Sequence, residues 1–444
     1  MRGLLRHKRI GVTLLSATLI AGCTHAPGPE VAPPSNPSDT VNMPAAGLST
    51  VPVEVEPDQA YAPFDRRRTA VVPQGWTLSV WARTDRPRLA AWTPDGNLLV
   101  SIPSAGQVLR FAPTPDGPPT KSVLLDGLDQ PHGLAFSGTT LYVAQSDQVD
   151  SYDYSAGSAE NPRTVAGALP DGRSPDLRGA YAHALKSVAV APDGAVYFSI
   201  GSTGNISAAD RTARPPRATI MRVPPGGGPA TAFATGVRNG TGLAVAPDGS
   251  IWTAVNGRDN VAFPEPGPDY GRVIPGYVAD HPPEQLARLS PGRELGWPYC
   301  NSDASHSGPA DLPFIRDVQT NPDGGQMDCA SLPPVEQSLG AHSAPLGLSF
   351  VDGELPAPFA RGALVGVHGS WNRQPPRAPE VSFFPWLGPW HDGDLGNQQT
   401  LVGGFQADDG SRWGRPVAAI AGPDGAVYIT DDAADAIYRL APPE

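Results

Sequence analysis

The stretch Val188-Ala-Val-Ala-Pro-Asp-Gly-Ala-Val-Tyr-Phe198 decides the fold of this chain. Short runs of alternating apolar residues stand on both sides of Pro-Asp-Gly, and such alternation is typical of β-strands with one buried face. Asp-Gly between two such runs indicates a tight hairpin, because glycine readily adopts the positive φ that the turn requires. The stretch therefore predicts two antiparallel strands joined by a short turn.

The same pattern recurs along the chain. Close copies cover residues 89–100, 243–252 and 419–429, and looser copies begin at residues 133 and 347. Six such hairpins, spaced about 40 to 100 residues apart, indicate a repeat architecture in which each copy belongs to one blade of a propeller. We therefore expect an all-β, six-bladed β-propeller over residues 66–444, with almost no helix and a long irregular insertion at about 260–342.

The composition agrees with a turn-rich globular domain. The 444 residues include 50 Gly and 53 Pro, and 40% of them are hydrophobic, which is enough for a core. The net charge of -12 makes a nucleic-acid partner improbable, because a phosphate backbone requires a basic surface.

The N-terminus has the features of an export signal. Basic residues precede a short apolar run at residues 10–20, which is too short to span a bilayer and has the length of a signal-peptide core. The run ends in Ile20-Ala-Gly-Cys23, which resembles a bacterial lipobox and predicts lipidation of Cys23 after removal of residues 1–22. Residues 23–65 are rich in Pro, Ala and Ser and predict a disordered tether. We therefore expect an exported lipoprotein, anchored to a membrane and facing the periplasm or the cell exterior.

Two further cysteines remain, Cys300 and Cys329. In an exported chain they are expected to form a disulfide, although two free buried thiols are the alternative. Neither has a Cys or His at zinc-ligand spacing, so a zinc site is improbable.

Polar residues precede five of the six hairpins. They are Gln130 and His132, His183 and Lys186, Arg238 and Asn239, His342, and Arg412 and Arg415. The loop before the innermost strand of a blade lines one mouth of the central channel, so these side chains are expected to converge on one pocket.

Seven segments in the same order resemble the sorbosone dehydrogenase group of quinoprotein sugar dehydrogenases, which is related to soluble glucose dehydrogenase. The resemblance covers about residues 70–442. The segments are Leu128-Asp-Gln-Pro-His-Gly-Leu-Ala-Phe136, His183-Ala-Leu-Lys-Ser187, Arg238-Asn-Gly-Thr-Gly242, Leu295-Gly-Trp-Pro-Tyr299, His342-Ser-Ala-Pro-Leu-Gly347, His368-Gly-Ser-Trp-Asn-Arg373 and Trp413-Gly-Arg-Pro-Val417, with Thr430-Asp-Asp432 beyond.

The resemblance implies oxidation of a sugar or a sugar-derived aldehyde with bound pyrroloquinoline quinone (PQQ). His183 matches the general base, which takes the proton of the sugar C1 hydroxyl while hydride passes to the quinone. The cofactor has three carboxylates, for which guanidinium groups are suitable partners. The positions that correspond to cofactor contacts are Gln130, Lys186, Arg238, Asn239, Asn372, Arg412 and Arg415.

Calcium is the second cofactor that the resemblance implies, bound by backbone carbonyls in the segment that contains Gly257 and Arg258. The chain departs from the relatives at three places. The group tends to have Glu where Gly257 stands, and the glucose enzyme has an acid at the position of Ala182 and a lysine at that of Asn372.

Two other functions stay open. A six-bladed propeller with calcium could be a lactone hydrolase, or a non-catalytic propeller that only binds a ligand. The sequence names neither the sugar or aldehyde substrate nor the electron acceptor, and it contains no Cys-x-x-Cys-His motif for haem attachment.

Overall fold

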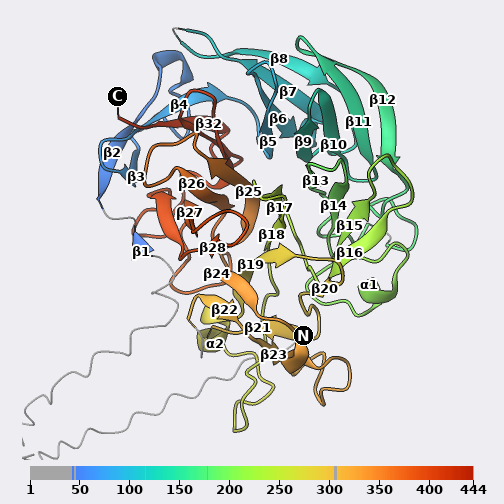
Figure 1. Cartoon of the computed structure of the whole chain (residues 1–444). Coiled ribbons are helices and arrows are strands. Elements are labelled where there is room, and N and C mark those ends of the chain that lie inside the picture. The colour runs from blue at the N-terminus through green and yellow to red at the C-terminus, as the bar shows by residue number, and fades with distance from the viewer. Residues whose placement is uncertain (1–42, 45–46, 116, 178, 305–307, 444) are drawn as a thin grey trace, which may run out of the picture. The chain divides into compact units, whose positions relative to one another are not determined.

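Six sheets of four to six strands and one small two-stranded sheet make up the computed structural model, which describes residues 43–44, 47–115, 117–177, 179–304 and 308–443 (Figure 1). We number the six larger sheets as blades 1 to 6 in chain order. Blades 1 and 2 contain β5 (Ala90–Trp92), β6 (Leu98–Ile102), β7 (Gln107–Ala112) and β8 (Thr120–Leu125), then β9 (Gly133–Ser137), β10 (Thr140–Ala144), β11 (Val149–Ser155) and β12 (Ser158–Ala166).

Blades 3 and 4 have five strands each. They contain β13 (Val188–Val190), β14 (Val196–Ile200), β15 (Thr219–Val223), β16 (Thr231–Thr235) and β20 (Arg293–Glu294), then β17 (Gly242–Val245), β18 (Ile251–Val255), β19 (Pro283–Leu289), β24 (Val335–Ala341) and β22 (Ala310–Leu312).

Blades 5 and 6 have six strands each. They contain β25 (Pro345–Asp352), β26 (Arg361–Val367), β27 (Glu380–Leu387), β28 (Asp394–Leu395), β29 (Gln399–Val402) and β1 (Met43–Pro44), then β30 (Pro416–Ala421), β31 (Val427–Asp431), β32 (Ala436–Ala441), β4 (Thr77–Arg83), β2 (Leu48–Glu54) and β3 (Thr69–Pro73).

The first strands of the blades form a closed ring. Each contacts the first strand of the next blade, in the order β5, β9, β13, β17, β25 and β30, and β30 returns to β5. Six clusters of buried apolar side chains each join one blade to its neighbour. The predicted six-bladed β-propeller is therefore confirmed, with its core between the blades rather than in one central mass.

Glycines at the start of inner strands let these strands approach closely. A Cβ on Gly133 would lie 2.6 Å from the backbone nitrogen of Val188, and one on Gly347 would lie 2.8 Å from the Cα of Ala418. Real Cβ atoms do not come so close to backbone, so a side chain at either position would push two blades apart.

Blade 6 is built from two distant parts of the chain. The N-terminal strand β4 pairs antiparallel with β32, and Arg83 pairs with Ala436 in the register. Strand β2 pairs in turn with β3 and β4, although its residues 48–54 belong to the segment that the sequence assigns to a disordered tether. The folded part therefore begins before residue 66, because alternate side chains of β2 bury apolar surface against blade 6. The predicted signal peptide, Cys23 and residues 23–42 lie outside the described residues.

The insertion between β18 and β24 is more regular than predicted. It contains β19, the third strand of blade 4, and the remaining short elements of this region are α2 (Pro275–Asp280), β21 (Cys300–Ser302), β23 (Phe314–Arg316) and η4 (Cys329–Ser331). A disulfide joins Cys300 to Cys329, with their Cα atoms 5.7 Å apart. The other helical turns are α1 (Ala209–Thr212), η2 (Pro57–Gln59) and η3 (Pro103–Ala105). Among the described residues, no helix combines the length and the apolar character needed to cross a membrane.

Candidate active site

One end of the propeller carries the predicted site residues. In each blade the loop before the first strand and the loop between the second and third strands lie at the same end, because consecutive strands are antiparallel. The Asp-Gly turns lie at the opposite end. Residues 127–132, 167–187, 236–241, 256–282, 342–344, 368–379 and 404–415 therefore share one end, as the sequence predicts.

A cavity of about 550 Å³ opens at this end between blades 6, 1, 2 and 3. Its walls include Arg86, Arg88, Gln130, Tyr181 and Asp432. Arg86 and Gln130 have positive φ, 43° and 48°, which non-glycine residues rarely adopt and which is common at ligand sites. The volume lies within the range of small-molecule sites.

The loop of His183 supplies Tyr181, Ala182 and Ala184 to the wall of this cavity, although His183 itself is not one of the lining residues. Its Nδ1 lies 3.0 Å from the backbone oxygen of Ser202, which can only accept, and 2.9 Å from the hydroxyl of the same residue, which already donates its proton to the oxygen of Gly204. The proton is therefore on Nδ1 and the lone pair on Nε2, which has no partner among the described residues. Burial, and next the positive charge of Arg238, lower the pKa of His183 to about 4.

Arg238 and Asn239 lie next to this histidine. A Cβ on Gly201 would be 2.6 Å from the Cβ of His183 and 3.2 Å from Oδ1 of Asn239, so the glycine makes room for both side chains. Arg238 is buried, and its guanidinium donates to the oxygen of Asn256 at 3.1 Å and lies 3.4 Å from the carboxylate of Asp259. Its buried Nε has no partner in the structure.

The predicted calcium segment has free carbonyls. The oxygens of Asn256 and Asp259 accept from Arg238 and Asn205, respectively, whereas in the described chain no donor reaches those of Gly257 and Arg258. The guanidinium of Arg258 is buried against Asp317 and Gln319. The two carbonyls that the sequence assigns to calcium are therefore unbonded.

Glu284, at the start of β19, approaches the same segment. Its Oε1 accepts from the backbone nitrogen of Gly257 at 3.3 Å. The side chain is buried, Oε2 has no partner, and burial raises the pKa of this carboxyl to about 8. Glu284 was not predicted as a site residue, because it lies in the insertion at about 260–342 that was expected to be irregular.

A second polar group joins blades 5, 6 and 1. Nε2 of His368 lies 2.7 Å from Asp432, and Arg88 pairs with the same carboxylate at 2.5 Å. Arg415 donates to the backbone oxygens of His368 and Gly369 at 2.8 and 3.2 Å. The sequence analysis assigned no role to His368, Asp432 or Arg88, although the first two lie in the segments that carry the family resemblance.

Lys186 is not a cofactor contact, contrary to the prediction. It is fully buried, and its ammonium donates to the backbone oxygens of Ser146, Pro170 and Ala184. An ammonium has three protons, so none is left for a ligand. Lys186 instead fixes the loop that carries His183.

Two other predicted cofactor contacts, Arg412 and Asn372, form hydrogen bonds within the protein. Arg412 donates to Gln406 at 2.8 Å and to the oxygen of Arg377 at 3.0 Å. Asn372 donates to Asn260 at 3.4 Å, and its buried Oδ1 has no partner in the structure.

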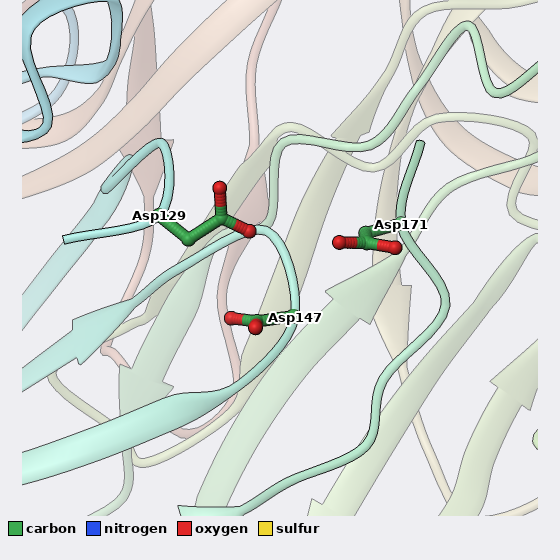
Figure 2. Close-up of side chains that lie close together, drawn as sticks. All are labelled: Asp129, Asp147 and Asp171. Carbon is green, nitrogen blue, oxygen red and sulfur yellow. The ribbon is translucent and has the colours of Figure 1, made fainter. Parts of the chain in front are cut away.

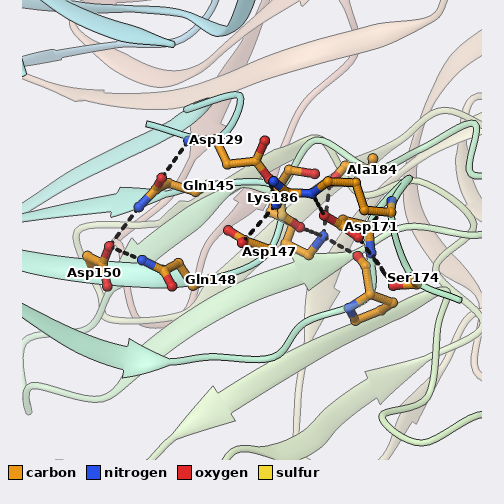
Figure 3. Close-up of polar contacts among 12 residues, drawn as sticks. Asp129, Gln145, Asp147, Gln148, Asp150, Asp171, Ser174, Ala184 and Lys186 are labelled. Atoms are coloured by element: carbon orange, nitrogen blue, oxygen red, sulfur yellow. Dashed lines mark hydrogen bonds and ion pairs between the residues drawn. The ribbon is translucent and has the colours of Figure 1, made fainter. Parts of the chain in front are cut away.

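Three carboxylates converge where the loop of His183 meets blade 2. Figure 2 shows Asp129, Asp147 and Asp171 with their carboxyl groups close together, and one oxygen of each lies within 4.8 Å of the others. Arg173 pairs with all three, at 2.5, 3.0 and 2.9 Å, and Lys186 lies in the same network (Figure 3). Because Arg173 already compensates these charges, we assign no metal to them. The cluster ties the cavity wall to blade 2.

Comparisons with known proteins agree with this geometry. A family model described as TrAA12-like matches residues 70–442. A protein of Borreliella burgdorferi without a functional name is 24% identical over 395 residues, which cover 84% of this chain and 90% of that protein.

Solved structures share the fold. The PQQ domain of pyranose dehydrogenase from Coprinopsis cinerea, in its holo form, is 22% identical, with a TM-score of 0.67 over 84% of this chain and 97% of that one. A calcium structure of a family AA12 enzyme from Trichoderma reesei has 19% identity and a TM-score of 0.65 over 84% and 96% of the two chains. The PQQ-bound aldose sugar dehydrogenase of Streptomyces coelicolor has 16% and 0.52 over 83% and 99%.

Proposed function

The chain belongs to the TrAA12-like family, and from this premise we propose that it oxidises a sugar or a sugar-derived aldehyde with PQQ and calcium. One observation carries the proposal most directly. A histidine with a fixed tautomer and a free Nε2 lies next to a buried arginine, on a loop that lines a cavity of about 550 Å³. The resemblance to the sorbosone dehydrogenase group favours a sugar or an aldehyde as substrate.

The donor set fits an anionic cofactor. Arg238, Asn239 and Arg415 lie at one end of the propeller with Gln130, and the partnerless Nε of Arg238 is an unused donor. Guanidinium and amide groups suit the three carboxylates and the ring oxygens of PQQ. Two structural relatives, a PQQ domain and a PQQ-bound dehydrogenase, support the same cofactor. When bound, PQQ would supply the two-electron oxidant.

The role of His183 follows from its tautomer. Since Nδ1–H donates to Ser202, Nε2 is the atom that accepts the proton of the substrate hydroxyl. The low pKa keeps the imidazole neutral at neutral pH, as a base must be. The free carbonyls of Gly257 and Arg258 are hard oxygen donors, which fit calcium.

We also propose that residues 1–22 direct export and that Cys23 carries the lipid anchor. The substrate would be a small molecule rather than a nucleic acid.

Reconstitution tests the proposal. Metal-free protein is titrated with PQQ and calcium, and aldoses and aldehydes are screened with an artificial electron acceptor. A change in the absorbance of the bound quinone and sugar-dependent dye reduction are expected, and His183→Gln should abolish the second but not the first. Hydrolysis of a lactone without dye reduction would favour the hydrolase alternative, and neither activity with any ligand would favour the non-catalytic one.

A matched control is His391→Gln. His391 is an exposed histidine in the loop after β27, at the opposite end of the propeller. This variant should keep both the absorbance change and the dye reduction.

A further inference from the structure

Glu284 is a buried acid without a full set of partners. Only 4% of the residue is exposed, and its Oε2 forms no hydrogen bond in the structure. A buried carboxyl oxygen without a partner destabilises the folded state, so proteins retain such a group mainly where a ligand binds it.

The other acceptors beside Glu284 are also free. Its Oε1 lies 3.3 Å from the nitrogen of Gly257, whose missing Cβ would stand 3.6 Å from its Cγ. The carbonyl oxygens of Gly257 and Arg258 accept no hydrogen bond from any described residue. Glu284 therefore contacts the segment whose two carbonyl oxygens are unbonded, and its own Oε2 is unbonded as well.

The neighbouring cationic groups have other partners. Arg238 donates to Asn256 and faces Asp259, and the guanidinium of Arg258 turns away to Asp317. His342 binds the oxygen of Val278 at 2.6 Å through Nε2, and its Nδ1 lies 3.5 Å from Asp259. None of these side chains forms a hydrogen bond with Glu284 in the described structure, although the charge of His342 and the backbone N–H of Ala344 oppose the effect of burial on the pKa of its carboxyl.

We propose that Glu284 is a calcium ligand, together with the carbonyl oxygens of Gly257 and Arg258. This inference rests on the proposed function, in which calcium is a cofactor. One carboxylate and two carbonyls are hard oxygen donors, and calcium accepts six to eight of them, so the cofactor and water can complete the coordination.

Calcium binding to the cofactor-free protein tests the inference without reference to activity. Calcium is titrated by calorimetry into metal-free wild type, Glu284→Gln and Glu336→Gln. Glutamine has the shape of a protonated glutamate but cannot supply a carboxylate. We expect Glu284→Gln to lose calcium affinity by about ten- to a hundred-fold.

Glu336→Gln is the matched control. Glu336 is in β24 of the same blade, and its carboxylate lies 3.6 Å from Arg293. This variant should bind calcium as the wild type does. Wild-type affinity in Glu284→Gln, or an equal loss in both variants, would overturn the assignment.

A second measurement needs no substitution. In wild-type protein, calcium should slow amide hydrogen exchange at residues 256–259 and 283–286, and leave residues 335–337 unchanged. Absence of this protection overturns the assignment of Glu284. If the wild type binds no calcium with or without PQQ, the calcium part of the proposed function is wrong as well. If calcium binds normally and Glu284→Gln does not change its affinity, only this inference is wrong.

Discussion

The pH dependence of His183 gives the sharpest test of the proposed chemistry. Burial and the charge of Arg238 lower its pKa from 6.5 to about 4, so the base loses its function only when the pH falls through about 4. At about pH 5.5 a base with an unshifted pKa would be roughly 9% neutral, whereas one with a pKa of about 4 would be roughly 97% neutral. Activity at this pH should therefore be about ten-fold higher than an ordinary histidine allows.

The assay is the pH profile of kcat/KM, which reports the ionisations of the free enzyme. The acid limb should lie near pH 4, and His183→Gln should lower kcat by about a hundred- to ten-thousand-fold. A titration of the labelled imidazole by NMR in cofactor-free protein checks the pKa directly. In that experiment Arg238→Met should raise the pKa of His183, because a positive charge is removed.

Two results would refute this reasoning. An acid limb at or above pH 6.5 would indicate a different base, and His342 is the candidate, since its hydrogen bonds to Asp259 and Val278 raise its pKa against the effect of burial. Full turnover in His183→Gln would remove the general-base role altogether.

Other predictions concern the cofactor, the fold and the membrane. Arg238→Ala should weaken PQQ binding by about ten- to a hundred-fold, the value of a charge-assisted pair worth about 1.5 to 3 kcal/mol, and saturating PQQ should restore activity; unchanged affinity in a quinone titration would contradict the contact. Replacing Cys300 and Cys329 by Ala opens a loop with a sequence separation of 29 and should lower the free energy of unfolding by about 3.5 kcal/mol in urea denaturation; a loss under about 1 kcal/mol would speak against the disulfide. Cys23→Ser should move the protein from the membrane fraction to the soluble fraction, and continued sedimentation with membranes would rule out a lipid anchor. Arg173→Ala should raise the rate of amide hydrogen exchange in residues 167–177 several-fold, because the three carboxylates then repel each other. An unchanged exchange rate would show that Arg173 does not hold this loop against blade 2.

The control for the last variant is Arg163→Ala. Arg163 pairs with Asp153 at 2.5 Å on the outer strands of blade 2, and both side chains are half exposed. It also removes one positive charge, but from blade 2 and not from the loop, so exchange in residues 167–177 should stay at the wild-type rate.

The repeated turn made the fold predictable, whereas the direction in which single side chains point could not be predicted. Each hairpin is a local feature, and four Pro-Asp-Gly hairpins with two looser copies fix the number of blades and the end at which the site lies. Lys186 was misjudged because it stands three residues after His183 on a loop without regular periodicity, and only tertiary contacts turn its ammonium inward. Glu284 was missed because it lies in the insertion that was predicted to be irregular, and only tertiary contacts bring its carboxyl to Gly257.

The boundary of the tether shows another limit. Residues 48–54 have few aromatic neighbours in sequence and were assigned to a disordered segment. They form β2 because they pair with β3 and with β4 of blade 6, and both partner strands lie later in the sequence. Local composition does not reveal an edge that is formed by residues elsewhere in the sequence.

The two-part blade 6 sets the order in which the molecule can be completed. The side chain of Arg83 donates to the backbone oxygen of Asp435, 352 positions later, and to that of Gln59. Bringing together two segments so distant in sequence costs about 5 kcal/mol of chain entropy. The ring of blades therefore stays open during synthesis. Because the chain is synthesised from its N-terminus, β4 has no β32 to pair with until residues 436–441 leave the ribosome or the export channel. Removing that six-residue strand should therefore harm folding more than a long insertion in a surface loop would.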